Sequence, residues 1–215
     1  MHIAKLLILF IALSVFNLVN TQAKIIFLDG TPASGKSTLA CEIKNQLQAQ
    51  DINTILIESD EIALSLNPNT PPWSKGVLLA IECAQFLAKS TTKDTIIIVD
   101  AFLWKELYDQ LSPHEFHFVL MYAPLELILH RFAQRAFCST QISQERIAHL
   151  FRDFLNLYFV ANNSENQVIA HYSSKENLYT HRRYDLIAYS ATESPTVLAQ
   201  QVINSFSTRN LFFKS

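Results

Sequence analysis

Residues 25–38 read IIFLDGTPASGKST, and Gly30–Ser37 within them fit the phosphate-loop pattern G-x-x-x-x-G-K-[ST] at every position. The pattern follows an apolar run and opens the amphipathic sequence 37–50, which predicts a strand before it and a helix after it. In that setting glycines let backbone N–H groups turn towards phosphate oxygens, and the helix N-terminus adds partial positive charge. The sequence therefore predicts a P-loop at the end of the first strand.

The residue types in this loop predict ATP and Mg²⁺ as cofactors. Lys36 is expected to reach the β- and γ-phosphates, and the Ser37 hydroxyl is expected to ligate Mg²⁺. The predicted nucleotide-binding residues are Gly30, Thr31, Pro32, Ala33, Ser34, Gly35, Lys36, Ser37 and Thr38. An ordinary strand–helix turn is the alternative. Glycine usage argues against it, because the chain has 3 glycines where average composition would give about 15, and Gly30 and Gly35 are two of them.

Outside the loop, apolar β-branched runs alternate with helical patterns. The predicted strands are 25–28, 54–58, 95–100, 116–122 and 186–189, and the predicted helices are 37–50, 77–89, 124–136, 143–158 and 195–207. The proline-rich stretch 67–76 and the polar patch 162–166 are predicted to be loops. Continuous apolar runs are typical of strands covered on both faces, which in alternation with helices indicates a parallel sheet. We therefore expect an α/β fold of the P-loop NTPase type.

The composition supports one globular domain and excludes several classes of protein. The chain has 215 residues, 49% of them hydrophobic, with a net charge of −2. That balance is far from the composition of disordered chains and gives no electrostatic footprint for nucleic acid, so no nucleic-acid partner is expected. The three cysteines, Cys41, Cys83 and Cys138, are too few and too scattered for a disulfide scaffold or a zinc site. We expect them to be buried small side chains, with a disulfide as the alternative if the protein is exported.

The first 23 residues have the order of a secretory signal peptide. One lysine precedes the apolar stretch 6–19, and a short polar segment ends at Ala23. This predicts a signal peptide over 1–23, a P-loop kinase domain over 24–215, and export to the periplasm or the medium. A membrane anchor is the alternative, and an uncleaved segment would be the only contact with a membrane. A misassigned start codon is the third interpretation.

Aspartates are predicted at the carboxyl ends of the first three strands, where ligands bind in open parallel sheets. Asp100 ends the third strand and is expected to hold Mg²⁺, with a capping role as the alternative. Asp29 directly precedes the P-loop and is expected to shape it.

Asp60, just past the second strand, is the predicted catalytic base. A carboxylate in that place could accept the proton of a substrate hydroxyl and orient it for attack. The alternative is that Asp60 is the N-cap of a helix over 61–66. Glu58 and Glu61 are weaker candidates for the role of the base.

Arginines on a later helix are candidates to stabilise charge on a transferred phosphoryl group. Arg131 and Arg135 are four residues apart and share one face of a predicted helix. Arg146 and Arg152 on the next predicted helix are further candidates, and a solvated basic face is the alternative for each arginine. The basic cluster 181–183 is predicted to be an exposed turn, with a phosphate or substrate contact as the alternative.

A resemblance to a known family rests on five stretches spread over most of residues 24–206. They are IIFLDGTPASGKST at 25–38, ESD at 58–60, IIIVDAF at 96–102, YAPLELILHRFAQR at 122–135 and HRRYDLIAYSATESPTVLAQQVI at 181–203. On these stretches the chain resembles the chloramphenicol phosphotransferase-like family of P-loop small-molecule kinases. The resemblance implies a five-stranded parallel sheet in the order 2-3-1-4-5.

The resemblance also implies roles for individual residues. Asp60 matches the catalytic base. Lys36 and Ser37 match the nucleotide and Mg²⁺ contacts, and Arg131 and Arg135 match the lid arginines.

The end of the chain is part of the resemblance but departs from the family in places. The loop 190–192 would lie against adenine. The residues at 134–138 (QRAFC) differ from the family in the lid, and those at 188–190 (AYS) lack a family carboxylate.

The resulting hypothesis is an ATP-dependent kinase, a phosphotransferase that acts on a hydroxyl of a small molecule. A zeta-toxin-like kinase of a sugar nucleotide is the second interpretation, since it shares the P-loop and a carboxylate base. The third is a nucleotide-binding protein without turnover, which the altered lid favours. The export signal favours it too, because ATP is scarce outside the cytoplasm.

Overall fold

The fold was analysed in a computed structural model. It describes residues 23–103, 107, 110–112, 115–138, 157–162, 167–172 and 179–207. The predicted signal peptide up to residue 22 and the candidate residues Arg146 and Arg152 lie outside these ranges. Within them, no helix combines the length and the apolar character needed to cross a membrane.

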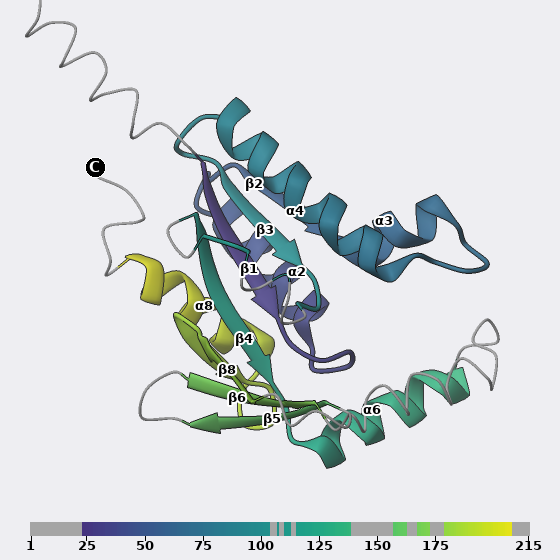
Figure 1. Cartoon of the computed structure of the whole chain (residues 1–215). Helices are drawn as coiled ribbons and strands as arrows, with labels where there is room; N and C mark the ends of the chain where they lie inside the picture. Colours follow the sequence, from purple (N-terminus) through teal and green to yellow (C-terminus); the bar gives the residue numbers. More distant parts are fainter. Residues whose placement is uncertain are drawn as a thin grey trace, which may run out of the picture.

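Five parallel strands form the central sheet in the order β2-β3-β1-β4-β8 (Figure 1). The strands are β1 (Lys24–Asp29), β2 (Thr54–Glu58), β3 (Ile96–Asp100), β4 (Phe116–Tyr122) and β8 (Leu186–Tyr189). This confirms the predicted fold class and the order 2-3-1-4-5. β1 lies in the middle, with Leu28 in register with Asp100 of β3. On its other side Asp29 is in register with Leu120 of β4. The turn that follows β1 therefore lies at the middle of the sheet's carboxyl-terminal end, between the ends of β3 and β4.

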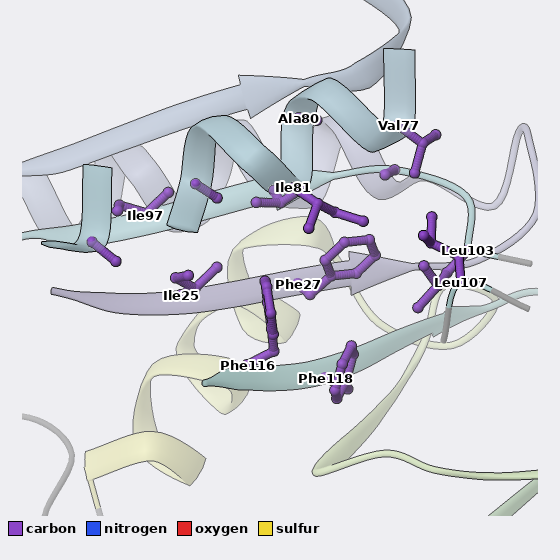
Figure 2. Close-up of a cluster of buried hydrophobic side chains, with 14 of the residues drawn as sticks. Ile25, Phe27, Val77, Ala80, Ile81, Ile97, Leu103, Leu107, Phe116 and Phe118 are labelled. Carbon is purple, nitrogen blue, oxygen red and sulfur yellow. The ribbon is translucent and has the colours of Figure 1, made fainter. Parts of the chain in front are cut away.

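One face of the sheet is covered by α4 (Trp73–Ser90). Because side chains alternate along a strand, Ile25 and Phe27 of β1 point to this face. Phe27 packs edge-on against Phe116 at 6.2 Å between ring centroids, and both rings are fully buried. Buried residues of α4 lie over these side chains in Figure 2, namely Val77, Ala80 and Ile81. Small alanines on α4 let the helix approach the aromatic layer closely.

The other face is covered by α2 (Lys36–Gln48) and α8 (Pro195–Ser207). Ile26 and Leu28, the alternate residues of β1, point to this side. They pack with buried residues of the two helices, among them Leu39, Ile43, Leu198 and Val202. The result is a three-layer sandwich in which β1 is buried on both faces, as its continuous apolar run predicts.

The helices α3 (Ser59–Leu66) and α4 meet so closely that one position must be glycine. A Cβ on Gly76 would lie 2.5 Å from the carbonyl oxygen of Ser59 and 2.8 Å from the Cβ of Ala63. The prediction of a loop over 67–76 was wrong at its end, because α4 already begins at Trp73 and Gly76 lies in its first turn. The backbone N–H of Gly76 donates a 3.0 Å hydrogen bond to the carbonyl of Pro72, which closes the first helical turn at this point.

A second, three-stranded antiparallel sheet was not predicted. It has the order β5-β6-β7, with β5 (Leu157–Asn162), β6 (Gln167–Tyr172) and β7 (Tyr179–Arg183). The predicted helix 143–158 is wrong at residues 157–158, which pair in β5, and its other residues lie outside the described ranges. The basic cluster 181–183 belongs to β7 and is not a turn, because it pairs with β6. Of the predicted loop 162–166, Asn162 pairs in β5 with Gln167 of β6, and the other residues lie outside the described ranges.

Two further predictions concern single residues. Cys41 and Cys83 are exposed free cysteines, which corrects the expectation that they are buried, and the Cys138 side chain is not described. Ala23, where the predicted signal ends, is only 6% exposed and belongs to the core under α4. Its backbone N–H donates a 3.0 Å hydrogen bond to the carbonyl of Ala88.

Candidate active site

The P-loop leaves the centre of the sheet in a conformation that depends on its glycines. Gly30 has a φ of 147°, and a Cβ there would lie 2.5 Å from the carbonyl oxygen of Met121. Gly35 has a φ of 108°, and Ala33 between them has a φ of 61°. These positive φ values turn the chain back on itself before α2 begins.

The loop has the properties that a phosphate group needs. Gly35 caps α2, and no side chain within the described part of the chain caps its first-turn N–H groups. The Ser34 side chain is fully buried, and its hydroxyl has no hydrogen-bond partner among the described residues. The Lys36 ammonium group donates a 3.2 Å hydrogen bond to the carbonyl of Thr31, which holds it over the loop. These residues therefore fit the phosphates of a nucleotide.

The remaining predicted contacts lie around this loop. Ser37 and Thr38 are exposed in the first turn of α2, where a hydroxyl could reach a metal ion. Pro32 is partly exposed, and Thr31 is buried at 6% exposure.

Asp29 is a structural carboxylate beneath the loop. It is fully buried, and its Oδ1 accepts hydrogen bonds from the backbone N–H of Gly30 at 2.7 Å and of Leu103 at 3.0 Å. Its Oδ2 accepts one from the Tyr184 hydroxyl at 2.5 Å. These bonds are the shaping role expected of Asp29. No local pattern pointed to Tyr184, which is 155 residues away along the chain.

Four carboxylates gather at the carboxyl ends of β2 and β3. Glu58 ends β2 in register with Asp100, which ends β3, and Asp100 is only 6% exposed. Asp60 and Glu61 follow in the first turn of α3, and both are exposed. The predicted base and the predicted metal ligand therefore belong to one cluster.

The alternative role of Asp60 as an N-cap is wrong. α3 begins at Ser59, two residues earlier than the helix expected over 61–66, and its N-cap is Glu58. Asp60 therefore lies inside the first helical turn, where a negative charge suits the positive end of the helix dipole.

The cluster has an electrostatic effect on Glu58. Burial raises the pKa of the Glu58 carboxyl above its ordinary value. The charges of Glu61, Asp100 and Asp60 raise the same pKa further, and Lys44 opposes them. Since a general base works best with a pKa near the working pH, this shift strengthens the candidacy of Glu58, which the sequence ranked below Asp60.

The predicted metal residues, Ser37 and Asp100, come from α2 and β3. In the described residues, no group of three or more His, Cys, Asp and Glu side chains could hold a metal ion by itself. Magnesium in proteins usually takes most of its ligands from phosphates and water. The Ser37 hydroxyl and the strand-end carboxylates fit an ion bound in that way.

Arg131 contacts the P-loop itself. It lies on α6 (Leu125–Cys138), which in Figure 1 runs away from the carboxyl end of β4. Its Nη1 lies 2.9 Å from the carbonyl oxygen of Ser34 and 3.0 Å from the Ser190 hydroxyl. The sequence resemblance assigned Arg131 and Ser190 to the nucleotide separately and did not predict that they bond to each other. The Arg135 side chain lies outside the described part, so its role stays a prediction.

Comparison with known proteins identifies the family of the chain. The model of the adenylylsulphate kinase (APS kinase) family matches residues 22–131, just over half of the chain. No curated protein sequence matches.

Solved structures share the fold. The Mycobacterium tuberculosis APS kinase CysC in complex with AMPPNP and APS is 17% identical, with a TM-score of 0.54 over 86% of this chain and 98% of that one. A sugar kinase from Janibacter sp. is 14% identical, with a TM-score of 0.52 over 89% and 99%. Shikimate kinase from Acinetobacter baumannii with shikimate is 17% identical, with a TM-score of 0.50 over 88% and 96%. At these identities the likeness concerns the fold.

Proposed function

The chain belongs to the adenylylsulphate kinase family, and from that premise we propose that it transfers the γ-phosphate of ATP to a hydroxyl group of a small molecule. The P-loop carries this proposal. Its glycine backbone, the uncapped start of α2 and the buried Ser34 hydroxyl together make an anion-binding site at the centre of the sheet edge. Lys36 supplies a positive charge at the same place.

The residues of the loop bind and orient, and a carboxylate moves the proton. Lys36 would pair with the β- and γ-phosphates, and the Ser37 hydroxyl would hold the magnesium ion together with Asp100. Mg·ATP, when bound, supplies the phosphoryl group that is transferred. Asp60, at the start of α3, would accept the proton of the attacking hydroxyl and orient its oxygen for in-line attack.

Glu58 is the second candidate for the base. It is a partly buried member of the cluster, and its raised pKa brings it closer to the range in which a carboxylate accepts protons readily. Asp60→Asn and Glu58→Gln separate the two. The variant of the true base should lose acceptor-dependent turnover by about two to four orders of magnitude and keep nucleotide binding.

The charge near the proposed base favours an acceptor without anionic groups. The ends of β2 and β3 hold four carboxylates. Between residues 45 and 88 Lys75 is the only basic residue, and the first arginine of the whole sequence is Arg131. An anionic acceptor would therefore meet repulsion from this cluster, which among the described residues Lys44 offsets only in part. An uncharged alcohol such as chloramphenicol, suggested by the sequence resemblance, suits this site better than adenylylsulphate or shikimate.

The test is ADP release by the purified protein with Mg·ATP over a panel of acceptors. The panel contains adenylylsulphate and shikimate as anions, chloramphenicol and free sugars as uncharged alcohols, and nucleotide sugars. Lys36→Ala is the inactive variant, and Lys89→Ala, at an exposed position in the last turn of α4, is its matched control. We expect turnover with an uncharged alcohol that Lys36→Ala loses and Lys89→Ala keeps.

The other outcomes assign other functions. Turnover with adenylylsulphate alone would give the chain the activity for which its family is named and would contradict the expected repulsion of anions. Turnover with nucleotide sugars would favour the zeta-toxin-like interpretation. Nucleotide binding without turnover on any acceptor would contradict the proposed kinase and favour a nucleotide-binding protein.

A further inference from the structure

The guanidinium group of Arg131 bonds to oxygen atoms of two separate loops. Nη1 lies 3.3 Å from the carbonyl oxygen of Ala33, 2.9 Å from that of Ser34 and 3.0 Å from the Ser190 hydroxyl. Nη2 donates a 3.1 Å hydrogen bond to the carbonyl of Ser190. Arg131 thus connects α6, the P-loop and the segment that follows β8.

These bonds control the direction of a peptide group in the P-loop. In a trans peptide unit the carbonyl and the following N–H point in opposite directions. Because Arg131 holds the carbonyl of Ser34, the N–H of Gly35 must point away from Arg131. The left-handed backbone of Ala33, which is costly for a residue with a side chain, is held by the same guanidinium group.

Ser190 is packed against the same part of the loop. A Cβ on Gly35 would lie 3.7 Å from Nη1 of Arg131 and 3.9 Å from the Cβ of Ser190. The N–H of Ser190 also donates a 2.9 Å hydrogen bond to the carbonyl of Tyr122, at the end of β4. Ser190 is therefore fixed to the sheet on one side and to Arg131 on the other.

We propose that Arg131 is a positioning residue, which fastens the segment after β8 to the P-loop and thereby orients the loop for the nucleotide phosphates. Its guanidinium group acts through the carbonyls of Ala33 and Ser34 and does not need to reach the transferred phosphoryl group. This differs from the lid role that the sequence resemblance implies for Arg131. The proposal rests on the nucleotide site proposed above.

Two measurements on the full chain test it, with the variants Arg131→Lys, Ser190→Ala and the double variant. The first is the melting temperature without nucleotide, which reports the Arg131–Ser190 connection by itself. The second is the dissociation constant for Mg·AMPPNP, together with kcat at saturating ATP if the chain turns over. His130→Ala, at an exposed neighbouring position on α6, is the control and should match the parent in both measurements.

We expect the two single variants to lower the melting temperature and the double variant to lower it by less than the sum, since the residues share one set of bonds. We expect Arg131→Lys to weaken Mg·AMPPNP binding about tenfold and Ser190→Ala about threefold, because a lysine keeps the charge but cannot hold the oxygens with a planar fork. At saturating ATP, kcat should change less than the dissociation constant.

Other results would overturn the proposal. Additive effects of the two substitutions on the melting temperature would show that the residues act independently. Unchanged Mg·AMPPNP binding with a large loss of kcat would give Arg131 a direct role at the phosphoryl group. If the parent chain binds no nucleotide, the proposed function itself is contradicted. If the parent and the variants bind Mg·AMPPNP equally well, only the role of Arg131 is contradicted.

Discussion

The hydroxyl of Tyr184 donates a 2.5 Å hydrogen bond to Oδ2 of Asp29, and the two residues are only 4% and 0% exposed. Tyr184 directly follows β7, and Asp29 directly precedes the P-loop. The bond therefore joins the end of the second sheet to the start of the phosphate loop. It also satisfies an oxygen of a carboxylate that has no exposed surface.

Removing that hydroxyl should destabilise the protein. Tyr184→Phe would remove a hydrogen bond to the buried Asp29 carboxylate, at a cost of about 1–3 kcal/mol, seen as a lower melting temperature. Tyr189→Phe is the matched control, because the Tyr189 hydroxyl is buried and has no hydrogen-bond partner within the described part of the chain. Its removal should leave stability unchanged or slightly increased. If Tyr184→Phe and Tyr189→Phe lower the melting temperature equally, the role given to Tyr184 is contradicted.

The raised pKa of Glu58 predicts how stability depends on pH. A carboxyl whose pKa is raised by folding favours the folded state when protonated, and this contribution is lost as the pH rises through the folded-state pKa. Glu58→Gln should therefore melt above the parent at neutral pH. The difference in melting temperature between the variant and the parent should become smaller as the pH falls towards the ordinary pKa of glutamate, about 4.3.

The measurement for Glu58 is made without Mg²⁺ or nucleotide, since either would alter the charge of the cluster. Glu82→Gln, at an exposed position on α4, is the control and should follow the parent at every pH. If the difference in melting temperature between Glu58→Gln and the parent stays constant between mildly acidic and neutral pH, the Glu58 carboxyl is not the source of the pH dependence.

The contact between α3 and α4 should not tolerate a side chain at position 76. In Gly76→Ala the new methyl would meet the Ser59 carbonyl oxygen at 2.5 Å, so the helices must separate. The cost of such overpacking is about 1–3 kcal/mol, which the better helix propensity of alanine offsets only in part. Cys83→Ala, at an exposed position of the same helix, should be nearly neutral in denaturant unfolding. A Gly76→Ala variant as stable as the parent would contradict the close approach.

The core position of Ala23 bears on the proposed export signal. Cleavage after Ala23 would remove its buried methyl group and its bond to Ala88, together about 1–2 kcal/mol. A chain of residues 24–215 should therefore melt below one that begins upstream of Ala23 and so keeps its peptide N–H. Equal melting temperatures would mean that the fold does not depend on Ala23.

Export itself is tested by fractionating cells that make the full chain. Under the proposal, a shortened chain is found outside the cytoplasm, and the sequence of its N-terminus gives the cleavage site. Full-length chain confined to the cytosol would contradict export, and full-length chain in the membrane fraction would favour the anchor.

The central sheet could be predicted because its signals are local. The apolar runs of β1 and β3 and the amphipathic pattern of α8 each lie within one short segment, and the predicted bounds of α8 agree with the structure at both ends. The P-loop could be predicted for the same reason, since its residues are consecutive.

Features that depend on distant residues could not be predicted in this way. Among the described strands, β5, β6 and β7 pair with one another in an antiparallel sheet, which the strand–helix alternation of the main sheet does not predict. α4 starts at Trp73 and not at Val77, and Gly76 in its first turn lies against α3, a contact that the local sequence does not reveal. The bond between Arg131 and Ser190 spans 59 residues, and neither residue carries a local signal for the other.

The bonds that hold the P-loop also determine when it can form. Asp29 and Tyr184 are 155 residues apart in the sequence, and Ser34 and Arg131 are 97 apart. Closing segments of this length costs chain entropy and slows folding relative to local contacts. The P-loop should therefore reach its native conformation only after Arg131 and Tyr184 have docked beside it. On the ribosome, a nascent chain that ends before Tyr184 would contain the whole nucleotide-binding motif and would still lack the hydroxyl that bonds to Asp29 beneath it.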